Sequence, residues 1–134
     1  MHVFTNSSPT IFLIEEDNHA RTALATFLRQ HGYRLLVAAG VEDAFEWMTG
    51  TPYIHADLLL INLLGKSPEE ALTVGRRLRE HSKHDGNTPI VILPERIPPN
   101  LQGTDETLNN REWVCYYEDV NQLARLLASI LKPR

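Results

Sequence analysis

The apolar residues of this chain fall into five short runs that recur along its length. Each run is four or five residues long and lacks the alternation of a strand with one solvent-facing side. Continuous runs of this length are typical of strands buried on both faces of a parallel sheet. We therefore predict five strands, at residues 10–14, 35–39, 58–61, 90–93 and 113–116.

Between the first three runs, the apolar residues change to the period of an amphipathic helix. A first helix would carry the apolar residues of segment 20–28 and stop at Gly32. A second, shorter helix would begin near Val41 and close at Gly50. Glycine is a common residue just beyond a helix C-terminus, so both ends are marked by their chemistry.

Two further helices are marked by their N-terminal caps. Ser67 would cap the third helix, with Pro68 at its first position and Glu70 completing a capping box. That helix would reach Leu78 and fray into a polar segment. Asp119 would cap the last helix, whose buried stripe consists of Val120, Leu123, Leu127, Ile130 and Leu131.

The stretch at residues 94–110 is the weakest part of the pattern. It contains Pro94, Pro98, Pro99 and Gly103, which interrupt regular structure. We predict that the fourth helix is short or irregular, with a turn or two over residues 104–109.

Strands that alternate with helices indicate βαβ units and a parallel sheet, with right-handed crossovers. At this chain length, the favoured solution is the doubly wound, flavodoxin-like order 2-1-3-4-5, with helices on both faces. We therefore predict a five-stranded α/β fold. Residues 1–9 would form a short polar tail and residues 10–134 a single domain, which an effector domain could follow in a longer parent protein.

The net charge of −4 and the single cysteine narrow the function classes. A general nucleic-acid-binding surface needs clustered Lys and Arg, so we expect no direct nucleic-acid binding. One cysteine allows no internal disulfide, which favours a reducing compartment. No apolar stretch approaches a membrane span, and the N-terminus lacks the regions of a signal peptide. We expect a cytoplasmic protein without membrane contact.

A candidate site lies where the predicted strands end. Glu15 and Glu16 follow the first strand, Asn62 ends the third, Pro94 follows the fourth and Tyr116 ends the fifth. In an open parallel sheet, ligands bind beyond the carboxyl ends of the strands, at the switch point between the first and third. The sequence therefore places a pocket among these five residues.

From residue 10 to residue 131, the layout resembles a response-regulator receiver domain. The string IFLIEEDN at 11–18 is similar to the family's apolar strand ending in two acidic residues. The string ADLLLIN at 56–62 is similar to its third strand, and PIVIL at 89–93 to its fourth. Segment 119–130 resembles the closing helix. The order and spacing of these matches carry the resemblance, because no single match is specific.

The resemblance implies a phosphorylation site that this chain has lost. The phosphoacceptor aspartate falls on Asn62, and the Ser/Thr that senses the phosphoryl group falls on Pro94. The lysine that pairs with the phosphate falls on Tyr116, and the proline after it on Tyr117. The nearest alternative aspartate, Asp57, would lie about 16 Å away at the opposite end of the strand. We predict a degenerate pocket.

The family's acidic pair, which holds Mg²⁺, falls on Glu15 and Glu16. Both are longer than aspartate, and Asn62 removes one charge, whereas Mg²⁺ demands tight octahedral geometry. We predict no metal site and no cofactor, with these two glutamates as weak Mg²⁺ candidates. A related hypothesis is a raised pKa at Glu15 or Glu16, because Asp17 is close and Tyr116 supplies no positive charge.

Three other features suggest chemistry but favour structural explanations. Residues 65–67 match only the tail of a phosphate-binding loop, which needs a glycine where this chain has Leu60. His81 and His84 have helical spacing but no further Cys or His nearby. Cys115 lies within a predicted strand, without an evident basic partner for a catalytic thiol. We expect no enzyme activity.

The leading hypothesis is a signalling module of a two-component-type pathway that works without phosphorylation, by docking a protein partner or by forming a homodimer. Its surface would comprise the fourth helix, the fifth strand and the last helix, with Trp113 and Tyr117 as candidate contact residues. Trp113 falls where receivers carry a switching aromatic residue, but core packing explains it equally well. The alternative is a ligand-binding module that uses the vacated pocket.

Overall fold

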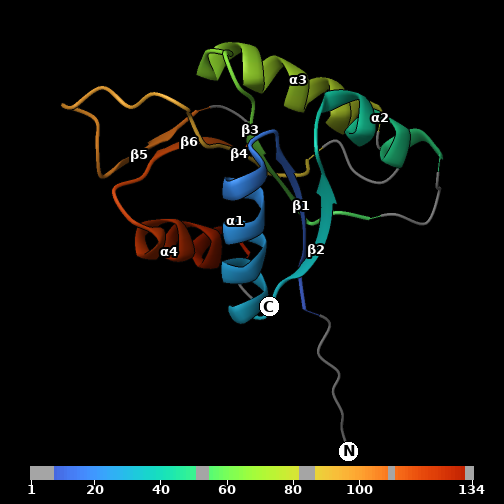
Figure 1. Ribbon diagram of the computed structural model, residues 1–134, viewed down its shortest axis with the longest axis horizontal. Coiled ribbons are helices and arrows are strands. Elements are labelled where there is room, and N and C mark those ends of the chain that lie inside the picture. The colour runs from blue at the N-terminus through green and yellow to red at the C-terminus, as the bar shows by residue number, and fades with distance from the viewer. Residues whose placement is uncertain (1–7, 51–54, 82–86, 109–110, 132–134) are drawn as a thin grey trace, which may run out of the picture.

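The computed structural model describes residues 8–50, 55–81, 87–108 and 111–131 (Figure 1). Six strands and four helices make up this part of the chain. In chain order they are β1 (Thr10–Glu15), α1 (Asn18–Gln30), β2 (Arg34–Ala38), α2 (Val41–Gly50), β3 (Leu58–Asn62), α3 (Pro68–His81), β4 (Ile90–Ile92), β5 (Thr104–Thr107), β6 (Glu112–Tyr116) and α4 (Val120–Ile130).

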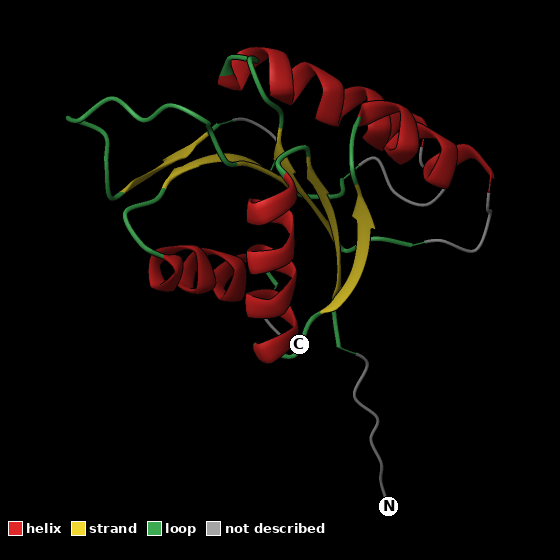
Figure 2. Cartoon of the chain, viewed as in Figure 1, coloured by secondary structure: helices red, strands yellow, loops and turns green. Residues whose placement is uncertain are grey.

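All strands belong to one sheet with the order β2-β1-β3-β4-β6-β5. The first five strands of this order are parallel, and only β5 runs antiparallel, along β6. The parallel part has the predicted order 2-1-3-4-5, with β6 as its fifth strand. The predicted α/β class is therefore confirmed, and β5 is an addition to it (Figure 2).

The prediction of a short or irregular helix between β4 and β6 is wrong. Residues 104–107 form β5, and the described residues from 93 to 103 are loop and turn; residues 109 and 110 lie outside the described part. The cause is local: Gly103 turns the chain with a φ of +86°, and only three residues separate it from Pro99, which is too few for a helix between them. The β-branched Thr104 and Thr107 then suit a strand alongside β6.

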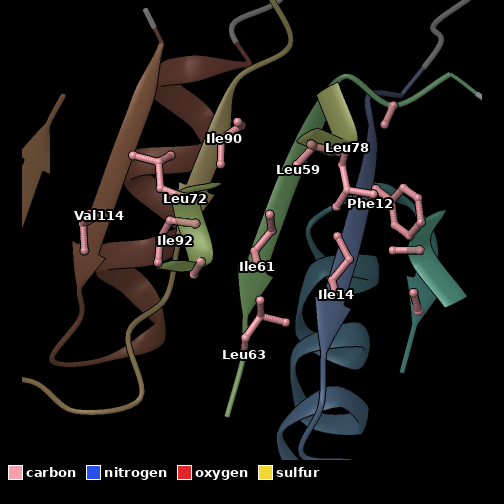
Figure 3. Packing of buried hydrophobic residues seen from close by; sticks show 14 of the residues in the cluster. Phe12, Ile14, Leu59, Ile61, Leu63, Leu72, Leu78, Ile90, Ile92 and Val114 are labelled. Carbon is pink, nitrogen blue, oxygen red and sulfur yellow. The ribbon is translucent and has the colours of Figure 1, made fainter. Parts of the chain in front are cut away.

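Helices cover both faces of the sheet (Figure 1). On one face, α2 and α3 bury Ala44, Ala71 and Leu72 against alternate strand residues such as Ile14 and Ile61 (Figure 3). On the other face, α1 and α4 pack on the alternate strand residues that point away from α2 and α3; the buried residues of these two helices include Leu24, Leu28, Leu123 and Leu127. Strands buried on both faces explain the continuous apolar runs.

Helix α3 is fixed to the sheet at two places. A Cβ added to Gly75 would lie 3.0 Å from Ile61 Cδ1 and 3.1 Å from Ile90 Cγ2, so the helix backbone approaches the sheet closely there. Near the start of β6, the buried Glu112 accepts from Arg76 Nη2 and Arg79 Nη2, each at 2.7 Å. These charged hydrogen bonds lower the pKa of Glu112.

Asp57 lies at the end of β3 opposite Asn62, as the sequence predicts. It precedes the strand, and its Oδ2 accepts from the Thr10 backbone N–H at 2.7 Å, at the start of β1.

Within the described ranges, none of the helices has the length and apolar character needed to cross a membrane.

Candidate functional site

The centre of the candidate site is a contact between Glu15 and Asn62, which end neighbouring strands. They are register partners in the parallel pair of β1 and β3. Asn62 Nδ2 donates to Glu15 Oε1 at 2.9 Å and to Glu15 Oε2 at 3.1 Å. The structure thus brings together two residues of the predicted pocket, Glu15 and Asn62.

The pKa of the Glu15 carboxyl group is raised, which is the direction hypothesised from the sequence, but the carboxyl group is fully buried, which the sequence did not predict. Burial is the main cause, and the negative charge of Asp17 adds to it. The hydrogen bonds from Asn62 and from the Asp17 N–H lower the pKa but do not outweigh burial. Asp17 itself is used as the N-cap of α1, where its Oδ2 accepts from Ala20 N at 3.2 Å.

The oxygen atom of the Asn62 amide lacks a hydrogen-bond donor within the described part of the chain. Among the described residues, Asn62 Oδ1 is the buried side-chain polar atom without a hydrogen-bond partner. Buried acceptors usually find a donor, because an unpaired one forfeits its hydration. The Glu15 carboxyl group therefore orients the amide, since both of its oxygens accept from Nδ2, and the Asn62 carbonyl is left unpaired.

Two further carboxylates hold the loop that follows β3. Glu16 Oε1 accepts from the Leu64 N–H at 2.6 Å, and Glu95 Oε1 accepts from the Gly65 N–H at 3.1 Å. Glu16 directly follows β1, whereas Glu95 lies in the loop after β4. Sequence reasoning missed Glu95; its position directly after Pro94 was the only available signal.

Pro94 is buried and lines a hollow of about 380 Å³ beside this loop. The other lining residues are those around the start of α3 and two that follow Pro94, namely Gly65, Lys66, Ser67, Pro68, Glu95 and Arg96. The hydroxyl of Ser67 accepts from the Glu70 N–H at 3.1 Å, and Glu70 Oε1 accepts from the Ser67 N–H at 2.9 Å. The predicted capping box is therefore confirmed.

Tyr116 ends β6 but is directed toward β5. Its hydroxyl donates to Glu106 Oε1 at 3.4 Å, a long hydrogen bond. Burial and the charge of Glu106 raise the pKa of Tyr116, which is nearly fully buried. The structure therefore connects Tyr116 to the edge strand, and not to the contact between Glu15 and Asn62.

Trp113 and Tyr117, the two candidate contact residues, are both half-buried. They pack against the cluster between the sheet, α1 and α4. Burial, followed by the charge of Glu15, raises the pKa of Tyr117. Their role as partner contacts stays a prediction.

The residues at this site do not fit Mg²⁺ as arranged. Both Glu15 oxygens accept N–H donors, and Glu16 Oε1 is taken by the loop after β3. Asp17 caps α1. Within the described part of the chain, no three Asp, Glu, His or Cys side chains come together as a metal site requires.

The features judged structural in the sequence have structural contacts. The His81 ring lies 5.1 Å from the Phe45 ring, edge to face, and His84 lies outside the described residues. Cys115 is fully buried in β6, and burial together with Asp105 raises the pKa of its thiol. A buried, protonated thiol is a poor nucleophile.

No family model and no curated protein sequence matches this chain. Solved structures match it in fold. A response regulator from Thermotoga maritima has a TM-score of 0.67 at 18% identity, covering 95% of this chain and 100% of its own. A two-component response regulator from Clostridium difficile has a TM-score of 0.68 at 18% identity, covering 93% and 97% of the two chains.

A third match is the receiver domain of a sensor histidine kinase from Pseudomonas aeruginosa PAO1, which was crystallised with a magnesium ion coordinated in its active site cleft. Its TM-score is 0.62 at 17% identity, covering 95% of this chain and 100% of that domain. Identities this low establish the fold and leave the function to the residues of the site. The chain therefore has the fold of response-regulator receiver domains.

Proposed function

We propose that this chain is a cytoplasmic, receiver-like signalling module of a two-component-type pathway that works without phosphorylation and without enzyme activity. It acts by contact with a protein partner. The observation that carries the proposal is the contact between Asn62 and Glu15. The resemblance to receivers assigns Asn62 to the phosphoacceptor position, and the contact supports the proposal because this non-nucleophilic amide is bonded to a buried carboxyl group.

The surroundings of Asn62 support the same conclusion. A phosphoryl group brings about two negative charges, which backbone N–H groups and cations must stabilise. Here Glu16 and Glu95 already accept from the N–H groups of Leu64 and Gly65. An incoming phosphoryl group would meet three carboxyl groups, including that of Glu15, and would be repelled.

The residues that would read a phosphoryl group are also missing. Pro94 has neither a hydroxyl group nor a backbone N–H. Tyr116 carries no positive charge, and its hydroxyl bonds to Glu106. We infer that the pocket holds one arrangement, so that the domain presents the same surface at all times.

The test is to incubate the protein with Mg²⁺ and acetyl phosphate, or with Mg²⁺ and beryllofluoride. We expect no mass increase of one phosphate and no change in the ¹H–¹⁵N spectrum at Asn62, Leu64 or Gly65. A conventional receiver domain treated in parallel serves as the positive control. A phosphate mapped to a residue of this pocket would refute the proposal.

A second candidate function is binding of a small ligand in the hollow beside Pro94. Its volume of about 380 Å³ is within the range of small-molecule sites, and Lys66 and Arg96 line it. The ¹H–¹⁵N spectrum with inorganic phosphate added alone decides between partner contact and ligand binding. Saturable shifts at Gly65 and Ser67 without a covalent mass change would favour this second function.

A further inference from the structure

Among the described residues, no strand pairs with the outer side of β5, the strand that replaces the expected fourth helix. Strand β5 is the last strand of the sheet, and all four of its residues are exposed. In Figure 1 it lies at the opposite end of the sheet from β2. An uncovered edge strand presents unpaired backbone groups, to which another extended chain can add.

The register shows which backbone groups face outward. Leu108 N donates to Glu112 O at 2.7 Å, and Thr107 pairs with Trp113 in the antiparallel register. Because hydrogen-bonded and non-hydrogen-bonded pairs alternate, Glu106 bonds to β6, whereas Asp105 and Thr107 do not. The N–H and C=O groups of Asp105 and Thr107 therefore point away from the sheet.

The side chains of β5 give this edge a negative charge on both faces. Asp105 lies on the α4 side, where its Oδ1 accepts from Gln122 Nε2 at 2.8 Å. Glu106 lies on the opposite side, next to the Tyr116 hydroxyl. Within the described ranges, neither carboxylate has an ion pair with a Lys or Arg side chain. Their charge is therefore available to a ligand.

We propose that β5 is the docking edge for an extended, basic segment of a partner protein, which adds to the sheet as a further strand. The outward groups of Asp105 and Thr107 supply its backbone hydrogen bonds. Adjacent Lys or Arg residues of the partner, one on each face, pair with Asp105 and Glu106. The inference rests on the proposed function and names its partner class.

The same charges argue against a second copy as the occupant. In an antiparallel pair of two β5 strands that uses both outward residues, Asp105 would face Thr107 and Glu106 would face Glu106. Like charges directly opposite each other destabilise a strand pair. A basic strand removes this repulsion, so the edge selects a different chain.

The first arm of the test uses a short fluorescein-labelled peptide, with two adjacent lysines flanked by valine and threonine. The control peptide has two glutamates instead. Anisotropy titrations should give a Kd for the basic peptide at least about tenfold lower than for the acidic one. In the ¹H–¹⁵N spectrum, exchange of the Asp105 and Thr107 amide protons should slow when the basic peptide binds.

The second arm changes the edge itself. Thr107→Pro removes an outward N–H that makes no bond to β6, and Thr107→Ala is the matched control that retains it. We expect Thr107→Pro to weaken binding about tenfold and Thr107→Ala by less than about twofold. Glu106→Gln should weaken binding about 2–5-fold, whereas Glu46→Gln on α2, with the same charge change, should have no effect.

Several results would overturn the proposal. They are equal binding of the two peptides, unchanged affinity of a folded Thr107→Pro variant, or no change in amide exchange at Asp105 and Thr107. Concentration-dependent dimers of the wild type that Thr107→Pro abolishes would make a second copy the occupant. The titrations contain no Mg²⁺ or phosphodonor. A failure here therefore leaves phosphorylation independence intact, and a response to phosphodonor leaves the β5 result intact.

Discussion

At the scale of single residues, the Glu15 carboxyl group makes the central contacts of the pocket. It is fully buried, and its hydrogen-bond donors are the Asn62 amide and the Asp17 N–H. Arg21 is close enough to lower its pKa slightly, but burial prevails. An amide carries no charge, so Asn62 only partly compensates a carboxylate in this environment.

Replacing Asn62 with aspartate tests how far the Asn62 amide compensates the burial of the Glu15 carboxyl group. In Asn62→Asp, the donor to Glu15 disappears and a second carboxylate lies against the first. We expect the free energy of unfolding to fall by about 2–3 kcal/mol at pH 7, measured by urea denaturation. Mg²⁺ should recover part of the loss.

The same variant should not restore switching, because Pro94 and Tyr116 remain unable to read a phosphoryl group. The measurement is the ¹H–¹⁵N spectrum with Mg²⁺ and beryllofluoride, compared between Asn62→Asp and wild type. Shifts that spread from the pocket to β6 would show that Pro94 and Tyr116 are not the obstacle.

The residue types of the pocket could be predicted from the sequence, but their contacts could not. Strand ends fix where Glu15 and Asn62 lie, because parallel strands end at one edge of the sheet. The partners of Glu16 and Glu95 depend on side-chain rotamers and on the path of two loops. Apolar periodicity contains no information about either, which is why Glu95 was missed.

At the scale of secondary-structure elements, strong apolar periodicity was sufficient to predict a helix or a strand, and weak periodicity was not. The five parallel strands and the four helices follow from apolar runs and capping residues. Strand β5 did not, because its four residues are all polar and exposed. Its structure depends on pairing with β6, a tertiary contact that outweighs local preference.

Gly75 is the residue that allows α3 to approach the sheet. Gly75→Ala should gain about 1 kcal/mol of helix propensity but lose about 1–3 kcal/mol to overpacking against the buried Ile61 and Ile90. We expect net destabilisation, measured by urea denaturation. Gly50→Ala at the end of α2 is the control, because nothing lies within 4 Å of its added Cβ. A stabilised Gly75→Ala variant would mean that α3 can move outward freely.

At the scale of the whole molecule, two buried glutamates at opposite ends of the sheet respond oppositely to pH. Arg76 and Arg79 lower the pKa of Glu112, so its contribution to stability is present above the usual 4.5 and is lost as the pH falls through the lowered value. The pKa of Glu15 is raised. Its burial therefore destabilises the fold increasingly as the pH rises from 4.5 through the raised value.

Glu15→Gln should separate the pH dependence of stability due to Glu15 from that due to Glu112. The new amide is neutral, and its NH₂ group can donate to the unpaired Asn62 Oδ1. We expect the variant to gain stability relative to wild type as the pH rises from 4.5 to 7, with little difference at pH 4.5. Urea denaturation at each pH measures this. A difference that does not change with pH would show that Glu15 has the same pKa in the folded and unfolded states.

The buried position of Cys115 has a practical consequence for covalent labelling. It is the only cysteine in the sequence, and in the folded protein its thiol is shielded and protonated. Cys115 packs in the same cluster as Leu123 and Leu127 of α4, so alkylating reagents can reach it only when this cluster opens. The rate of its modification therefore measures how often the packing between α4 and the sheet opens. A cysteine introduced on the surface would meanwhile carry a dye or spin label without competition.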